Sequence, residues 1–315
     1  MPEPVTSTVA VNGVELAVTE AGDGPLVVLC HGFPELAFSW RHQIPALAAA
    51  GYHVVAPDQR GYGASSRPEA IDAYDIVDLT DDIVGLIDHY GEDNAVVVGH
   101  DWGAPVVWNL AQRAPERVRG VVGMSVPHIR RAPAAPITLL KTMFGDVFFY
   151  ILYFQKPGVA DAELGASART TMTRFLSAIS GDSPEGSWRV LQKGAGFLDA
   201  MDDPAELPGW LPQADLDVFV KTFERTGFTG GLNWYRNIDR NWELSEAWAD
   251  RPIIQPALFI GGEFDPVLRF TSLDGLDTLV PGLRGTHLLA GGGHWIQQEQ
   301  PTEVNELLLE FLGGL

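Results

Sequence analysis

The chain has 315 residues, of which 46% are hydrophobic and 20% are charged, an ordinary composition for a globular protein. It contains 21 basic and 41 acidic side chains, and its formal net charge is −20. Because such an acidic chain repels phosphate backbones and anionic lipid, nucleic acids and membrane surfaces are poor candidates for partners. No apolar run approaches the roughly 20 residues that a membrane helix needs, so membrane insertion is not expected.

The single cysteine, Cys30, lies in the apolar run PLVVLC. One cysteine cannot form a disulfide within the chain, so Cys30 is expected to be a buried packing residue. The N-terminal sequence MPEPVTSTVA has neither the basic start nor the apolar core of a signal peptide. Because scarce cysteine also suits a reducing compartment, a cytoplasmic protein is expected.

Short apolar runs alternate with helix-like stretches in the first part of the chain. Residues 8–20 predict two strands around a turn at Asn12-Gly13. Apolar strands of the kind found in a sheet covered on both faces are expected at residues 25–30, 53–58, 94–100 and 119–127. Helix-like stretches between them, such as residues 75–91, predict a doubly wound, mostly parallel sheet of the α/β class.

This alternation stops after Pro127. Residues 128–250 are rich in aromatic residues and helical stretches, and they contain no clear strand of the earlier type. The strand pattern then resumes in QPALFIGG and RGTHLLA, and the chain closes with the amphipathic stretch PTEVNELLLEFLGGL. We therefore expect an α/β core built from residues 1–127 and 251–315, with an inserted helical cap domain at residues 128–250.

A glycine-flanked turn, GHDWG, follows the strand-like run AVVV and opens a helix. This is the sequence context of a nucleophile elbow, in which glycines permit a strained turn from strand to helix. Serine usually stands at the centre of this motif, whereas this chain has Asp101 there. The alternative is a structural aspartate that caps the helix. The preceding strand, the glycines and the partner motifs described below favour a nucleophile.

The aspartate decides the class of reaction. Serine attacking a saturated carbon would form an ether, which has no carbonyl for water to attack. A carboxylate attacking the same carbon forms an ester that water can hydrolyse, and aspartate is ionised at neutral pH without a base. Asp101 therefore predicts a substrate with an electrophilic saturated carbon, either an epoxide or an alkyl halide.

A second motif, HGFPE, directly follows the strand PLVVLC. In a site of this kind, one oxyanion donor is a backbone N–H of this loop and the other belongs to the residue after the nucleophile. The expected donors are therefore the N–H groups of Phe33 and Trp102. His31 is expected to hold the loop in place and to have no catalytic role.

Two late motifs, GEFDPV and GGGHW, each follow a predicted strand. The order nucleophile, acid, histidine is matched by Asp101, Asp265 and His294. Glu263 competes with Asp265 as the acid that orients the histidine, and Asp265 is preferred because a turn begins there, before Pro266. The six histidines outside the HGFPE and GGGHW motifs show no metal-ligand spacing, so neither a metal nor another cofactor is expected.

With HGFPE, GHDWGA, GEFDPV and GGGHW in this order, the chain resembles the soluble epoxide hydrolases of the α/β-hydrolase fold. The resemblance runs from about residue 9 to the C-terminus and continues through the cap, in YFQKPG and GLNWYRN. It implies that Tyr153 and Tyr235 hang from the cap and hydrogen-bond the epoxide oxygen. It also implies a cis arrangement of Phe33-Pro34.

A pair of phenols suits this chemistry, because opening an epoxide generates a strongly basic alkoxide. A phenol, with a pKa of about 10, can donate a hydrogen bond or a proton to it. Without the resemblance, both tyrosines would be taken as packing residues. The walls of the substrate pocket are expected to include Pro34, Trp234 and Trp295, together with Phe33 and Trp102.

The sequence therefore predicts an epoxide hydrolase whose partners are a lipophilic epoxide and water. A hydroxyalkyl ester would form on Asp101 and be hydrolysed by water that His294 activates. A haloalkane or haloacid dehalogenase is the nearest alternative, since it shares the aspartate nucleophile but releases a halide that needs no phenol. The alternative outside enzymes is a catalytically silent ligand-binding protein on this fold. A homodimer is left open.

Overall fold

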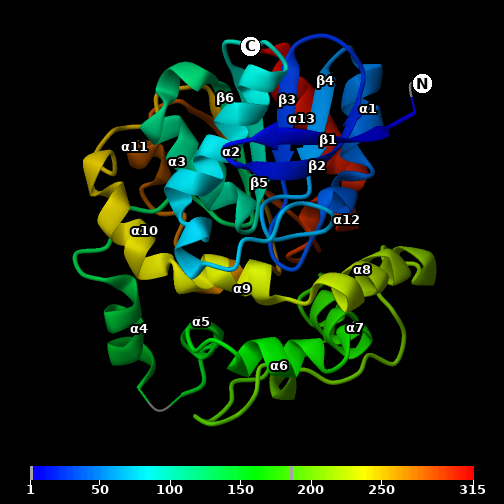
Figure 1. Cartoon of the computed structure of the whole chain (residues 1–315), viewed down its shortest axis with the longest axis vertical. Coiled ribbons are helices and arrows are strands. Elements are labelled where there is room, and N and C mark those ends of the chain that lie inside the picture. The colour runs from blue at the N-terminus through cyan, green and yellow to red at the C-terminus, as the bar shows by residue number, and fades with distance from the viewer. Residues whose placement is uncertain (1–2, 146, 185–186) are drawn as a thin grey trace.

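An eight-stranded sheet runs through the centre of the protein in the computed structural model, which describes residues 3–145, 147–184 and 187–315 (Figure 1). The strand order is β1-β2-β4-β3-β5-β6-β7-β8; β2 pairs antiparallel with β1 and β4, and the other pairs are parallel. The strands are β1 Val5–Val11, β2 Val14–Ala21, β3 Leu26–Cys30, β4 His53–Pro57, β5 Ala95–His100, β6 Val118–Met124, β7 Ala257–Gly262 and β8 Leu283–Leu289. The prediction of a mostly parallel α/β sheet is confirmed.

The burial of each strand follows from its place in the sheet. Every residue of β3, β5 and β7 is buried, because helices cover both faces of the central strands. The edge strand β8 alternates between half-buried and exposed residues. Cys30 pairs with Gly99, and His100 pairs with Met124, so β3, β5 and β6 end level with one another. The loops that follow these strands therefore meet at one edge of the sheet.

Two apolar clusters lie on opposite faces of the sheet. One contains buried residues of α2, α3 and the cap, and the other contains buried residues of α1 and α13. The helices of the core are α1 Gln43–Ala49, α2 Ile76–His89, α3 Gly103–Arg113, α11 Leu276–Leu279, α12 Ile296–Glu299 and α13 Pro301–Gly313. Asp75 begins α2 by accepting the N–H groups of Val77 and Asp78, and Gly91 follows its end with a φ of +73°.

The chain leaves the sheet after β6 and forms a layer of helices beyond its edge (Figure 1). These helices are α4 Pro136–Phe144, α5 Tyr150–Phe154, α6 Val159–Gly165, α7 Ala168–Ala178, α8 Gln213–Thr226, α9 Thr229–Arg236 and α10 Ile238–Leu244. Short 3-10 helices occur at Ala37–Trp40, Ile71–Tyr74, Pro115–Arg117, Leu198–Ala200, Ser245–Ala247 and Pro266–Arg269. The expected domain boundaries at residues 127 and 250 fall in the loop after β6 and in the loop before β7.

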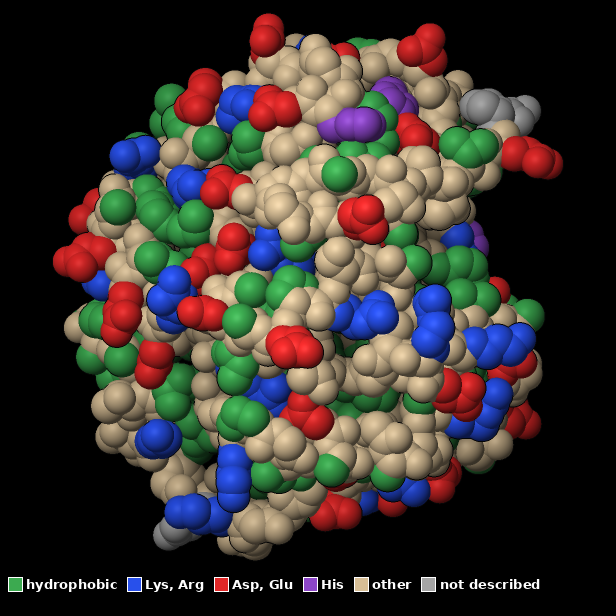
Figure 2. Space-filling view, in the orientation of Figure 1, with side chains coloured by type: hydrophobic (Ala, Val, Ile, Leu, Met, Phe, Trp, Pro, Cys, Tyr) green, Lys and Arg blue, Asp and Glu red, His purple; other side chains and the backbone are tan. Residues whose placement is uncertain are grey.

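The acidic side chains do not gather in one patch on the face that Figure 2 shows. Asp and Glu are spread over this face, with Lys and Arg among them. The acidic charge of the chain is therefore not concentrated at one place on this face. None of the helices in the described ranges is both long enough and apolar enough to cross a membrane.

The contact of α3 with β6 provides a test of the core. A Cβ atom added to Gly123 on β6 would lie 2.3 Å from a ring carbon of Trp108 on α3. Trp108 cannot easily move, because its ring is buried and its indole N–H donates to the Val126 carbonyl at 3.1 Å. Gly123→Ala is therefore expected to lower the free energy of unfolding by about 1–3 kcal/mol, measured by chemical denaturation.

Gly165→Ala, at the end of α6, is the matched control for this change. A Cβ atom at Gly165 would meet no other atom within 4 Å, so this substitution should leave stability unchanged or slightly higher. Equal midpoints for the two variants would contradict the packing that is described for Gly123.

Candidate active site

Asp101 stands on a sharp turn between β5 and α3. Its φ is +49°, a left-handed conformation that residues other than glycine rarely adopt. The flanking glycines are needed for a different reason, because they allow neighbouring backbone segments to approach each other closely. A Cβ atom on Gly99 would lie 2.1 Å from the Gly103 carbonyl oxygen, and one on Gly103 would lie 2.1 Å from the Cys30 carbonyl oxygen. The strain of the elbow is thus carried by Asp101 itself, and the glycines let the turn pack against β3.

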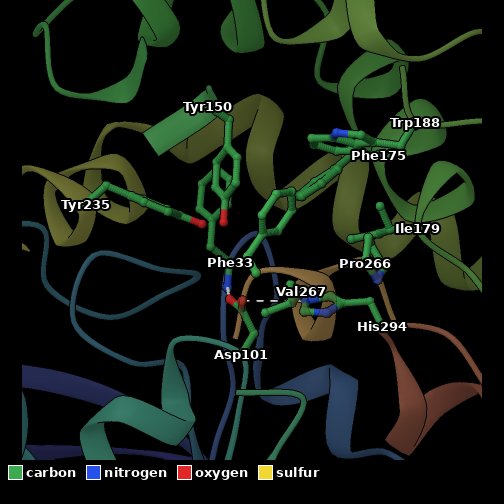
Figure 3. Close-up of a pocket in the computed structure, with 11 residues that line it drawn as sticks. Phe33, Asp101, Tyr150, Phe175, Ile179, Trp188, Tyr235, Pro266, Val267 and His294 are labelled. Carbon is green, nitrogen blue, oxygen red and sulfur yellow. Dashed lines mark hydrogen bonds and ion pairs between the residues drawn. The ribbon is translucent and has the colours of Figure 1, made fainter. Parts of the chain in front are cut away.

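The two carboxylate oxygens of Asp101 have different surroundings (Figure 3). Oδ1 accepts a hydrogen bond from the Phe33 N–H at 2.7 Å, and Oδ2 lies 3.5 Å from His294 Nε2. The loop that carries Phe33 comes so close because of Gly32, where a Cβ atom would lie 2.3 Å from Oδ1. One oxygen is therefore held by the predicted oxyanion donor, and the other faces the histidine.

His294 is held by the acid that the sequence analysis preferred. Its Nδ1 lies 3.0 and 3.1 Å from the two carboxylate oxygens of Asp265, which is buried and also accepts the Val267 N–H. Glu263 is exposed, and its carboxylate accepts a hydrogen bond from the Gly291 N–H at 3.2 Å. Asp265, and not Glu263, is thus placed to orient the imidazole.

The charges around His294 control its protonation. Burial alone would lower the pKa of His294, but the negative charges of Asp265 and Asp101 outweigh burial and raise this pKa well above its usual value. Burial would likewise raise the pKa of Asp265, but the charge of His294 lowers it. His294 therefore lies between two acidic side chains whose charges favour its protonated form.

A cavity of about 40 Å³ opens above Asp101 and His294, between the core and the cap. Its other lining residues are Phe33, Tyr150, Phe175, Ile179, Trp188, Tyr235, Pro266, Val267 and Phe270. Nearly all of these side chains are apolar or aromatic, so the cavity favours a lipophilic ligand. No group of three or more His, Cys, Asp or Glu residues within the described ranges could hold a metal ion.

Two tyrosine hydroxyls face Asp101 from the cap, and one of them is not the predicted one. Tyr150 on α5 and Tyr235 on α9 line the cavity, with their ring centres 6.0 Å apart (Figure 3). Tyr153 does not line it; its hydroxyl interacts with the carboxylate of Glu163 on α6. The placement of Tyr153 at the pocket was wrong, because the sequence does not reveal which of two tyrosines on α5 turns toward the core. Burial, and then the charge of Asp101, raise the pKa values of Tyr150 and Tyr235, so both hydroxyls keep their protons.

The predicted wall residues Pro34, Trp234 and Trp295 are buried behind the lining and do not belong to it. The indole N–H of Trp234 donates to the Arg60 carbonyl at 3.1 Å, and that of Trp295 donates to the Leu176 carbonyl at 2.9 Å. Trp295 packs against the ring of His294, with ring centres 4.7 Å apart, and Trp234 packs against Trp102 at 6.1 Å. The expected cis peptide bond between Phe33 and Pro34 is present.

Trp102 packs its ring against Tyr235, with ring centres 5.0 Å apart. Trp102 is the N-cap residue of α3, and N–H groups at this end of a helix have no partner within the helix. This position is suited to a second oxyanion donor, and that role stays a prediction.

A buried polar pair beneath the site was missed by the sequence analysis. His100 Nδ1 lies 2.6 Å from Glu35 Oε2, and His100 Nε2 lies 2.7 Å from the backbone carbonyl of His294. Burial would raise the pKa of Glu35, but the charge of His100 lowers it to about 2. Both residues lie inside the recognised motifs HGFPE and GHDWG, yet no spacing rule pairs them.

Comparisons with known proteins agree with this geometry. The model of the α/β-hydrolase fold family matches residues 25–301. Epoxide hydrolase A of Mycobacterium tuberculosis is 54% identical over 320 residues, which cover 100% of this chain and 99% of that protein. The crystal structure of epoxide hydrolase A from Mycobacterium thermoresistibile is 53% identical, with a TM-score of 0.96 over 99% of both chains. The bifunctional epoxide hydrolase 2 of Sus scrofa is 41% identical over 95% of this chain and 53% of that protein.

The fold and the aspartate elbow therefore define a hydrolase of the α/β-hydrolase fold. Within this fold, the chain belongs to the epoxide hydrolase family.

The pairing of His294 with Asp265 can be tested directly. Replacing Asp265 with Asn removes a negative charge that favours the imidazolium, so the pKa of His294 should fall. Titration of the histidine ring signals by NMR measures this change.

The matched control is Glu263→Gln, which removes the same charge from the exposed competitor. It should leave the titration of His294 as in the wild type. A large shift in this variant, or none in Asp265→Asn, would contradict the assignment.

Proposed function

We propose that this protein converts a lipophilic epoxide to a vicinal diol through a covalent ester on Asp101. The observation that carries the proposal is the position of the Asp101 carboxylate. One of its oxygens is bonded to the Phe33 N–H, and the other faces His294 beneath the hydroxyls of Tyr150 and Tyr235. The names of the relatives, all epoxide hydrolases, support the same reaction.

In the first step, Oδ2 of Asp101 attacks one carbon of the epoxide, and the bond from that carbon to the epoxide oxygen breaks. Oδ2 is the expected nucleophile because Oδ1 is already held by the Phe33 N–H. The electron pair moves to the leaving oxygen, which takes a proton or a short hydrogen bond from the phenols of Tyr150 and Tyr235. A positioned acid of this kind contributes about 10²–10⁴-fold to the rate.

Ester formation also prepares the second step, because it removes the negative charge of Asp101. One of the two charges that raise the pKa of His294 is then lost, so His294 can give up a proton that replaces the one the phenols passed to the alkoxide, and it then acts as a base. It deprotonates water, whose oxygen bonds to the ester carbonyl carbon. The bond from that carbon to the diol oxygen then breaks, the diol oxygen takes the remaining proton of the attacking water, and Asp101 is again a carboxylate. The developing charge falls on Oδ1, next to the Phe33 N–H and, as predicted, the Trp102 N–H. Each oxyanion donor is worth about 10²–10³-fold.

The phenols also favour the epoxide over the alkyl halide. A halide leaves as a stable anion and needs no proton, whereas the alkoxide from an epoxide is strongly basic. Two protonated tyrosines above the nucleophile are therefore suited to epoxide opening. The apolar lining of the cavity supports a lipophilic substrate.

Three further parts of the proposal concern the whole chain. Residues 1–127 and 251–315 would form the core domain, and residues 128–250 would form the cap. A cytoplasmic location is supported by the free, buried thiol of Cys30, which suits a reducing compartment. A homodimer stays a prediction that size-exclusion chromatography with light scattering can test.

His294→Gln should stop the reaction after the first step. The variant keeps Asp101 and both tyrosines but lacks the base that activates water, so the hydroxyalkyl ester should accumulate. Intact mass spectrometry after incubation with styrene oxide should show one added substrate mass, which peptide mapping places on Asp101. A wild-type enzyme that forms diol from this probe while the variant shows no adduct would argue against a covalent route.

Tyr150→Phe and Tyr153→Phe form a matched pair on one short helix. Loss of the Tyr150 hydroxyl should reduce kcat/KM for epoxides by about 10²-fold or more, because the alkoxide loses an acid. Loss of the Tyr153 hydroxyl should change kcat/KM by less than about twofold, because that group lies outside the cavity.

The same assays separate the two candidate reactions. Diol formation from styrene oxide, with no halide release from a chlorinated alkane of similar size, is the expected result. Halide release that does not depend on Tyr150 would instead favour a dehalogenase.

A further inference from the structure

The carboxylate of Glu299 binds the backbone on both sides of His294. Glu299 is the last residue of α12, and its side chain turns back toward the loop that carries His294. Oε2 accepts the Gly293 N–H and Oε1 accepts the Trp295 N–H, each at 2.8 Å. Oε2 also accepts the N–H of Gly181, again at 2.8 Å, and Gly181 belongs to the cap.

The three N–H groups meet because the cap backbone lies directly on the histidine loop. The His294 N–H donates to the Ile179 carbonyl at 2.9 Å. A Cβ atom on Gly181 would lie 2.1 Å from the Gly291 carbonyl oxygen, and one on Gly293 would lie 2.2 Å from the Gly181 nitrogen. No side chain fits between the two segments, and Figure 3 shows Ile179 and His294 on the same side of the cavity.

At such a contact, backbone N–H groups that lie away from water need acceptors. A carboxylate serves three of them at once, because its two oxygens provide about four acceptor positions. An amide at the same place would provide one acceptor oxygen and would turn its NH₂ group toward at least one N–H. A carboxylate is therefore the side chain that matches this arrangement.

We propose that Glu299 is a positioning residue for hydrolysis of the alkyl-enzyme. Its carboxylate joins the His294 loop to the cap segment at residues 179–181 through hydrogen bonds, and it places a negative charge near the imidazole. This inference rests on the proposed function. Glu299 does not contact Asp101 or the two tyrosines in the cavity, so the first step should not depend on it.

The charge of Glu299 acts on His294 together with that of other groups. Burial raises the pKa of Glu299, while its three N–H donors and the charge of His294 act in the opposite direction and favour the carboxylate. The other titratable groups that face the imidazole are Asp101, Asp265 and His100, which is itself paired with Glu35. Asp101 becomes neutral in the alkyl-enzyme, so the remaining negative charges weigh more in that state. Removing Glu299 should then lower the pKa of His294 in the alkyl-enzyme.

The test is Glu299→Gln in the full chain, with styrene oxide as the probe. Hydrolysis of the alkyl-enzyme should slow by about 10- to 100-fold, because a small displacement of a catalytic group has effects of this size. In the steady state kcat should fall while kcat/KM, which reports the first step, changes by less than about twofold. The ester should accumulate in intact mass spectra. The acidic limb of the single-turnover hydrolysis profile should move to lower pH.

Two further variants separate position from charge. Glu303→Gln removes the same charge from an exposed residue at the start of α13 and should behave as the wild type. Glu299→Asp keeps the charge but is one methylene shorter, so it cannot hold all three N–H groups. It should slow hydrolysis while leaving the acidic limb in place.

Several results would overturn the inference. Hydrolysis within twofold of wild type in Glu299→Gln would do so, and so would an equal loss of kcat and kcat/KM. If Glu299→Gln does not fold, as judged by circular dichroism, Glu299→Asp takes its place in the test. Hydrolysis at the wild-type rate in Glu299→Asp would then overturn the inference. A wild-type protein that forms no diol would instead count against the proposed function, which is a separate result.

Discussion

The site depends on a single negative charge, which the fold holds in two ways at once. Asp101 takes a left-handed conformation at the end of β5, and this bend lifts its carboxylate off the edge of the sheet. A backbone N–H binds one oxygen, and His294 Nε2 lies 3.5 Å from the other. The conformation is unfavourable for aspartate, so the surrounding packing, with glycines that admit neighbouring backbones, has to impose it.

The same charge links the two chemical steps in time. In the proposed mechanism, the charge of Asp101 raises the pKa of His294 before the ester forms. Once the carboxylate becomes an ester, that effect disappears and the histidine can accept a proton from water. A buried site amplifies this effect, because charges interact more strongly where water is excluded.

The cavity is lined by residues of both the core and the cap. The core supplies Asp101, Asp265 and His294, and the cap supplies Tyr150, Tyr235 and much of the apolar lining. The two parts share one apolar cluster, and the cap backbone touches the histidine loop directly. The helical layer and the sheet region are therefore in direct backbone contact next to His294.

The sequence by itself determined the sheet, and it predicted Asp101 as nucleophile, the HGFPE loop as oxyanion donor and the order of the acid and the histidine, because these depend on local patterns. Apolar runs, turns with glycine and residues that follow strands are all read within a few positions of the chain. Tertiary structure alone decided that Tyr150 and not Tyr153 faces Asp101, that Trp234 and Trp295 stand behind the lining, and that His100 pairs with Glu35. The physical reason is that these facts depend on how helices rotate and pack against the sheet, and contacts between distant segments leave no periodic signal in the sequence.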